Sequence, residues 1–155
     1  MKRLHVSLGV EDLEASIRFY TTLFGQEPSL RREGYAKWML EDPRVNFVLD
    51  QKGANRGVDH LGIQVEDEAE LAELSSRLKD DGQSVELLEN NECCYARQDK
   101  FWISDPQGLP WETFKTHELI EDYGDDTRLR DVLEPRETKP GEAKAGQAKS
   151  GGCCD

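Results

Sequence analysis

The sequence predicts an α+β fold in which two βαβββ modules pair to form one domain. Apolar and polar residues alternate in several short segments, as they do in half-buried strands, and two longer segments have helical apolar spacing. The second half of this region also repeats the first. The sequence HVSLGVED at residues 5–12 aligns with HLGIQVED at residues 60–67 at a constant offset of 55. A duplicated module is the simplest explanation of this pattern.

The first module is expected to span residues 1–52. Residues 2–8 alternate apolar and polar side chains and predict a strand, with His5 facing away from the apolar side. Asp12 is expected to cap a helix that ends at Gly25. Short runs with strand composition then predict three strands, at about residues 27–32, 35–41 and 45–50.

The second module is expected to span residues 58–117. Asp67 is placed to cap a helix, and Gly82 is placed to end it. Residues 105–108, with the sequence DPQG, have the composition of a type I turn. The strands of this half are predicted at residues 84–88, 94–104 and 110–116.

The two modules together give one predicted domain at residues 1–117. Residues 118–155 are expected to be a tail that is acidic at first and then low in complexity. From Glu134 onward it is rich in Pro, Glu, Lys, Gly and Ala, a composition typical of disorder. The last residues are GGCCD, and their pair Cys153-Cys154 repeats the adjacent cysteines at Cys93-Cys94, so it is a candidate second site for a soft centre such as As(III).

The charge balance limits the partners of this chain. It carries 20 Lys and Arg against 32 Asp and Glu, for a net charge of -12. This field repels phosphate backbones, so we expect no nucleic-acid partner. No apolar run approaches the roughly 18 residues of a membrane span. The pattern at the N-terminus predicts a first strand rather than a signal peptide. We therefore expect a cytoplasmic protein, a monomer or a homodimer, with reduced and reactive cysteines.

Three residues are candidate metal ligands. His5 and His60 occupy equivalent positions of the repeat, so a pseudo-twofold axis would bring them together. Glu112 lies between large aromatic residues in a predicted strand, where a carboxylate is costly to bury unless it is paired or ligated. Asn46 is its expected counterpart in the first module. Two histidines and one carboxylate form a facial triad suited to Fe(II) and dioxygen, although zinc, manganese or nickel would accept the same ligands.

Cys93 and Cys94 are candidate substrate ligands. Successive side chains of a regular strand point to opposite faces, so the pair can chelate one atom only in an irregular segment. Asn90-Asn91 favours a turn at this point and therefore predicts such a segment. Trivalent arsenic, cadmium and mercury are the soft centres that would suit two thiolates. Arg97 and Lys100 are expected to favour the thiolate form.

The paired modules, the two histidines and the DPQG turn before Glu112 resemble the vicinal oxygen chelate superfamily of glyoxalase I, fosfomycin resistance proteins and extradiol dioxygenases. Within it, the chain is similar to the carbon–arsenic lyases and the related cadmium-induced proteins. Three stretches carry this similarity: YAKWMLEDPRVNFVL, VDHLGIQVE and NECCYARQDKFW.

The resemblance implies that His5, His60 and Glu112 bind Fe(II) and that Cys93 and Cys94 hold a trivalent organoarsenical. It also implies a dioxygenase that acts as a C–As lyase, cleaving methylarsenite or aromatic arsenicals to arsenite, with no catalytic residue beyond the metal ligands. One alternative is a thiol-based protein that binds cadmium or arsenic without turnover. Another is a glyoxalase-like isomerase or thiol transferase, which we rank lower because Asn46 is a poor fourth ligand.

Overall fold

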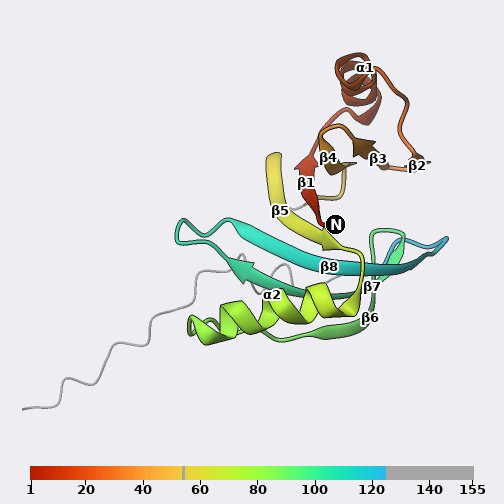
Figure 1. Ribbon diagram of the computed structural model, residues 1–155. Helices are drawn as coiled ribbons and strands as arrows, with labels where there is room; N and C mark the ends of the chain where they lie inside the picture. Colours follow the sequence, from red (N-terminus) through yellow and green to blue (C-terminus); the bar gives the residue numbers. More distant parts are fainter. Residues whose placement is uncertain (54, 125–155) are drawn as a thin grey trace, which may run out of the picture.

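The computed structural model describes residues 1–53 and 55–124. Its α+β fold confirms the prediction, because a single mixed sheet of eight strands curls into a half-barrel and carries two helices (Figure 1). The strand order is β2-β3-β4-β1-β5-β8-β7-β6, so each module supplies four neighbouring strands. The first strand of each module lies at the centre, where β1 and β5 pair in antiparallel fashion. The sheet is therefore symmetric about the β1–β5 junction.

The elements follow one another in the same order in both modules. The first module contains β1 (Arg3–Gly9), α1 (Leu13–Phe24), β2 (Leu30–Arg32), β3 (Tyr35–Glu41) and β4 (Arg44–Asp50). The second contains β5 (Gly57–Val65), α2 (Glu68–Asp80), β6 (Leu88–Cys93), β7 (Ala96–Ser104) and β8 (Pro110–Leu119). Within each module the first and last strands pair in parallel, β1 with β4 and β5 with β8, and these pairs lie next to the central junction.

The predicted caps form in both helices. The Asp12 side chain accepts a hydrogen bond from the backbone N–H of Ala15 at 2.9 Å, and Gly25 ends α1 in the left-handed conformation. In α2 the Asp67 side chain accepts from the N–H of Glu70 at 2.8 Å. Neither helix is long and apolar enough to cross a membrane, and this holds for the whole part of the chain that the structure describes.

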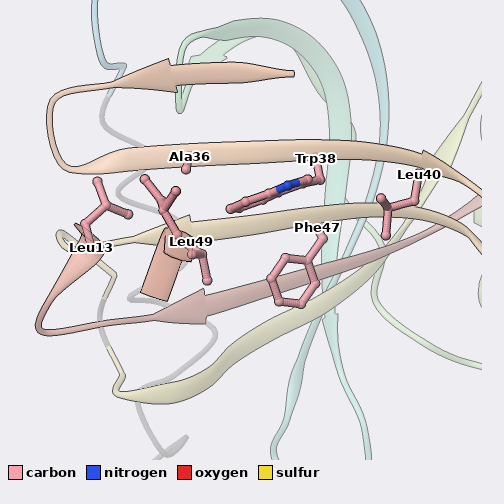
Figure 2. Packing of buried hydrophobic residues seen from close by; sticks show 7 residues of the cluster. Leu13, Ala36, Trp38, Leu40, Phe47 and Leu49 are labelled. Carbon is pink, nitrogen blue, oxygen red and sulfur yellow. The ribbon is translucent and has the colours of Figure 1, made fainter. Parts of the chain in front are cut away.

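Both helices pack on the same face of the sheet. The opposite face lines a cavity. Figure 2 shows the cluster under α1, in which side chains of β3 and β4 pack together with Leu13. On β3 the residues Ala36, Trp38 and Leu40 enter this cluster, whereas the alternate residues Tyr35 and Lys37 line a cavity on the opposite face. The period of two thus separates an apolar face from a face lined by functional groups.

Two boundaries of the second module differ from the prediction. We expected strands at residues 84–88 and 94–104, whereas β6 lies at Leu88–Cys93 and β7 begins at Ala96. The predicted turn at Asn90-Asn91 is wrong. Asn90 has a positive φ of 51° inside β6, and the pairing with β7 shifts register between Leu88 and Asn91, which is the pattern of a β-bulge.

The C-terminal end of the described region continues past residue 117. β8 extends to Leu119, and residues 120–124 follow it without a helix or strand. The predicted low-complexity tail, including Cys153 and Cys154, lies beyond residue 124 and outside the described residues.

Candidate metal centre and thiol pair

Three neighbouring strands bring the predicted metal ligands together. His5 lies on β1, His60 on β5 and Glu112 on β8. The register pairs Gly62 of β5 with both His5 and Glu112, so a residue without a side chain separates these two in the sheet. A Cβ atom at Gly62 would lie 2.3 Å from the Glu112 carbonyl oxygen and 3.3 Å from the His5 Cβ. Glycine is therefore required for the close approach of the three ligands.

The three side chains converge on one point. The Nε2 atoms of His5 and His60 are 3.1 Å apart, and the Glu112 Oε2 lies 3.8 Å from the first and 3.7 Å from the second. All three residues are buried. Spacings of this size suit ligands that share one ion at about 2.0–2.2 Å each.

Neighbouring groups fix the tautomer of both histidines. The Nδ1 of His5 lies 3.1 Å from the Asn46 carbonyl oxygen, and the Nδ1 of His60 lies 2.9 Å from the Asp59 carboxylate. A carbonyl and a carboxylate only accept hydrogen bonds, so each Nδ1 carries the proton and each Nε2 presents a lone pair. Two lone pairs facing each other at 3.1 Å repel unless a cation lies between them. This arrangement fits a metal ion.

Burial keeps His5 ready to act as a ligand. Loss of solvent and the nearby His60 lower the pKa of His5 to about 4, despite the opposing effect of Glu112. The imidazole is therefore neutral near pH 7, which is the form that coordinates a metal.

Lys100 holds the other oxygen of Glu112. Its Nζ donates to the Glu112 Oε1 at 3.0 Å, and its side chain is 0% exposed. Burial alone would raise the pKa of Glu112, but Lys100, His60 and His5 outweigh it, and the pKa lies below its ordinary value. The carboxylate is therefore ionised, with Oε2 directed at the histidines and Oε1 held by Lys100.

The symmetric position of Glu112 in the first module is Val48. At the offset of the repeat, Ser7 corresponds to Gly62, and Val48 pairs with Ser7 as Glu112 pairs with Gly62. Asn46, the expected counterpart, pairs with His5 instead. Val48 cannot bind a metal, so the described strands of the sheet offer three candidate protein ligands at this centre.

The two thiols converge in a tight hairpin turn. Cys93 is the last residue of β6 and pairs with Ala96, which leaves Cys94 and Tyr95 as the two turn residues. Their φ angles of 53° and 66° are both positive, as a type I′ turn requires. The Sγ atoms of Cys93 and Cys94 lie 2.8 Å apart. The turn thus brings together two side chains that a regular strand would separate.

The surroundings of the thiols differ from our expectation. The guanidinium of Arg97 pairs with Glu92 and Glu118 at the surface, and Lys100 pairs with Glu112. Hydrogen bonding to Cys93 and burial raise the pKa of Cys94 well above its ordinary value, and the opposing effect of Lys100 is smaller. Lys100 thus favours the thiolate of Cys94, as predicted, but the hydrogen bond and burial outweigh its effect and keep the thiol form. Arg97 is engaged with surface carboxylates instead.

Residues 120–124 lie across the hairpin. The N–H of Ile120 donates to the Tyr95 carbonyl at 3.0 Å, and the N–H of Cys94 donates to the Gly124 carbonyl at 3.3 Å. Tyr123 donates its hydroxyl hydrogen to Asp50 at 2.7 Å and accepts from the Cys94 thiol at 3.8 Å. No local sequence pattern predicts this role, because it depends on contacts between segments that are far apart in the chain.

One cavity connects the two candidate sites. It has a volume of about 200 Å³, and both the triad and the thiol pair line it. Its wall also contains rings and polar groups from both modules: Tyr35, Lys37, Asp50, Asp59, Gln98, Trp102, Phe114 and Tyr123. A small molecule held by the sulfurs would therefore share its cavity with an ion held by the triad.

Sequence comparisons match this chain to one family and to named proteins. The model of the glyoxalase/bleomycin resistance protein/dioxygenase superfamily matches residues 2–113. A "trivalent organoarsenical cleaving enzyme" of Bacillus sp. (strain MD1) is 44% identical over 90% of this chain and 88% of that protein. The "cadmium-induced protein CadI" of Mycobacterium bovis is 35% identical over 86% of this chain and 89% of its own length.

Solved structures share the fold at lower identity. The 2,3-dioxygenase LapB of Pseudomonas sp. KL28 is 20% identical with a TM-score of 0.55, over 76% of this chain and 41% of that one. A Mn(II)-bound glyoxalase of Novosphingobium aromaticivorans is also 20% identical, with a TM-score of 0.54 over 81% of this chain and 43% of that one. The present chain thus spans less than half the length of these two proteins.

Proposed function

We propose that this chain, which belongs to the glyoxalase/bleomycin resistance protein/dioxygenase superfamily, cleaves the carbon–arsenic bond of trivalent organoarsenicals. The observation that carries the proposal is the single cavity lined by both a thiol pair and a two-histidine, one-carboxylate cluster. Relatives that are 38–44% identical and named as organoarsenical cleaving enzymes support it.

His5, His60 and Glu112 would hold the metal, which we propose to be Fe(II). The donor set and the two Nε2 lone pairs that face each other fit such an ion. When bound, Fe(II) supplies binding and activation of dioxygen as the co-substrate. The chain itself contributes the fixed tautomers, through Asn46 and Asp59, and the ionised carboxylate, through Lys100.

Cys93 and Cys94 would bind the arsenic. An arsonous acid, R–As(OH)₂, reacts with two thiols to give two As–S bonds and two molecules of water. The thiol protons leave with the hydroxyl groups, so the raised pKa of Cys94 does not prevent this exchange. The convergence of the sulfurs at 2.8 Å suits chelation of one atom and fixes the direction of the third arsenic substituent.

The overall reaction balances with one dioxygen. Methylarsonous acid and O₂ contain the same atoms as arsenous acid and formaldehyde, so arsenic stays trivalent while the carbon is oxidised. The rings of Trp102 and Phe114 line this cavity beside the triad and would disfavour water next to the reacting carbon.

Purified protein loaded with Fe(II) and mixed with methylarsenite in air tests this proposal. We expect arsenite and formaldehyde in equal amounts, and neither product under argon or with Glu112→Gln. Tight binding of the arsenical without release of arsenite in air would contradict the lyase activity.

A thiol-based binding protein without turnover is the second candidate. The close approach of the two sulfurs favours it, because chelation needs no metal in the triad. Resistance of cells to methylarsenite separates the two functions. His60→Ala, with Cys93 and Cys94 intact, should abolish resistance if cleavage is required and should preserve it if binding is sufficient.

A further inference from the structure

We propose that Lys37 forms an anion subsite in the cavity, which selects arsenicals whose aromatic ring carries an acidic substituent. This inference rests on the proposed function, since it takes the arsenic to be held by Cys93 and Cys94. It concerns the third substituent on arsenic, the organic group, which neither the thiols nor the triad would bind.

Lys37 faces the cavity from the first module. It lies on β3, where its neighbours Ala36 and Trp38 point into the core under α1, so its own side chain points to the opposite face. The register places Lys37 beside Val48, Val48 beside Ser7, and Ser7 beside His60. The lysine therefore lies in the same row across the sheet as a metal ligand, with two small side chains between them.

Lys37 is also close to the thiol pair. Cys94 packs against the cluster of Tyr35, Val48 and Tyr95, together with Leu30. Val48 and Leu30 are the two residues that flank Lys37 in the register of β3 with β4 and β2. Burial lowers the pKa of Lys37 and the nearby Cys94 opposes this shift, which agrees with the placement. A group attached to arsenic on these sulfurs would thus project beside the lysine.

The ammonium group lacks a counter-ion among the described residues. No hydrogen bond or ion pair joins the Lys37 Nζ to any of residues 1–53 or 55–124, whereas the deeper Lys100 is paired with Glu112. Burial lowers the pKa of Lys37, because a half-buried cation without a partner is costly. An anionic ligand group would offset this cost.

The cavity has room for an aromatic ring. Its volume is about 200 Å³, whereas a cavity of about 150 Å³ is sufficient to bind benzene. A methyl group on arsenic would leave most of this space empty. Rings of Tyr35, Trp102, Phe114 and Tyr123 line it, and such walls suit edge and offset contacts with an aryl group.

Binding of three probe arsenicals tests the subsite: phenylarsonous acid and its 3- and 4-carboxyphenyl derivatives. Full-length protein is loaded with Fe(II) and titrated under argon, so that no turnover occurs. Cys153 and Cys154 are both changed to Ser in every sample, so that only Cys93 and Cys94 remain. The dissociation constants are measured by isothermal titration calorimetry, with Lys37→Met as the test variant.

We expect at least one carboxylated probe to bind roughly tenfold more tightly than phenylarsonous acid, as a charged hydrogen bond in a cavity allows. Lys37→Met should remove this preference and leave the affinity for phenylarsonous acid unchanged. Lys37→Arg should keep much of the preference. Lys52→Met is the matched control, because Lys52 also lines the cavity but is exposed and lies over the Tyr123 ring, and it should retain the preference.

Two results would overturn the subsite. One is a wild-type protein that does not prefer either carboxylated probe. The other is a Lys37→Met variant that loses affinity equally for charged and neutral probes, since this would mean that Lys37 acts on the thiols. Failure of the proposed arsenic site would look different: phenylarsonous acid would not bind, or its binding would survive Cys93→Ser with Cys94→Ser. Failure of the proposed cleavage would leave this binding intact but release no arsenite in air.

Discussion

Lys100 is the residue on which the ionisation of the triad depends most directly. It is completely buried, and its ammonium group contacts the Glu112 oxygen that is turned away from the histidines. The sequence suggested a role near the thiols, because Lys100 follows Cys94 by six residues. The pairing of β7 with β8 directs it to Glu112 instead. Such a partner cannot be recognised before strand register is known.

Replacing Lys100 should destabilise the metal-free protein. Lys100→Met leaves the Glu112 carboxylate buried without its ammonium partner, and the free energy of unfolding should fall by about 3 kcal/mol. A bound divalent ion supplies the missing positive charge, so Fe(II) or Zn(II) should raise the melting temperature more in the variant than in the wild type. Thermal and denaturant unfolding with and without metal measure both effects.

The matched control is Lys115→Met, in which an exposed ion pair with Glu68 is lost. Exposed pairs of this kind contribute at most about 1 kcal/mol, and the metal-induced change in melting temperature should stay at the wild-type value. Equal destabilisation by the two variants would contradict the role of Lys100.

The hairpin between β6 and β7 holds its thiols at a conformational cost. Type I′ turns favour Asn and Gly, because both turn residues have positive φ, yet this turn contains Cys94 and Tyr95. The left-handed conformation costs such residues about 1 kcal/mol or more each. Because Cys94 and Tyr95 are not typical turn residues, we predicted the turn at Asn90-Asn91 instead.

Cys94→Gly should therefore separate stability from binding. The variant removes the strained side chain, and its free energy of unfolding should be unchanged or higher by up to about 1 kcal/mol. Its affinity for phenylarsonous acid should fall by at least an order of magnitude, because one of two As–S bonds is lost. Cys94→Val is the comparison: it also removes the thiol but should destabilise the fold. If both variants unfold alike, the turn is not strained.

The segment after β8 should hold the hairpin through the glycine at position 124. A Cβ atom there would lie 2.2 Å from the Glu92 carbonyl oxygen and 2.7 Å from the Cys93 backbone nitrogen. Gly124→Ala should therefore displace residues 120–124, and arsenical affinity should fall several-fold. Gly25→Ala is the control, since its Cβ meets nothing within 4 Å. It should cost about 1 kcal/mol at the end of α1 and leave arsenical affinity at the wild-type value.

The whole molecule is a duplicated sheet in which the site is asymmetric. The repeat and the alternating patterns were sufficient to predict the modules, both helices and the approach of His5 to His60. The register between paired strands cannot be predicted from the sequence, so Asn46 rather than Val48 was taken as the counterpart of Glu112 in the first module. The packing of residues 120–124 on the thiols also escaped prediction, because no local pattern marks a segment that pairs across the fold.

The symmetry of the two modules predicts that a fourth metal ligand can be introduced at Val48. A carboxylate at this position would face the triad as Glu112 does, from the opposite module. Val48→Glu should add a fourth protein ligand, increase affinity for Zn(II), and reduce arsenite formation on the order of tenfold, because the added carboxylate would fill a position that the proposed reaction leaves for dioxygen. Val48→Gln, of similar size and without charge, should not raise Zn(II) affinity. Unchanged metal affinity in Val48→Glu would contradict the inferred symmetry of the site.

The most direct test is to locate arsenic and iron in the same molecule. Crystals of Fe(II)-loaded, full-length protein with phenylarsonous acid under argon would give anomalous difference maps at the arsenic and iron absorption edges. We predict arsenic bonded to the sulfurs of both Cys93 and Cys94, and iron bound by His5, His60 and Glu112 in the same cavity. Arsenic bound elsewhere on the chain, or iron absent from the triad, would contradict the account.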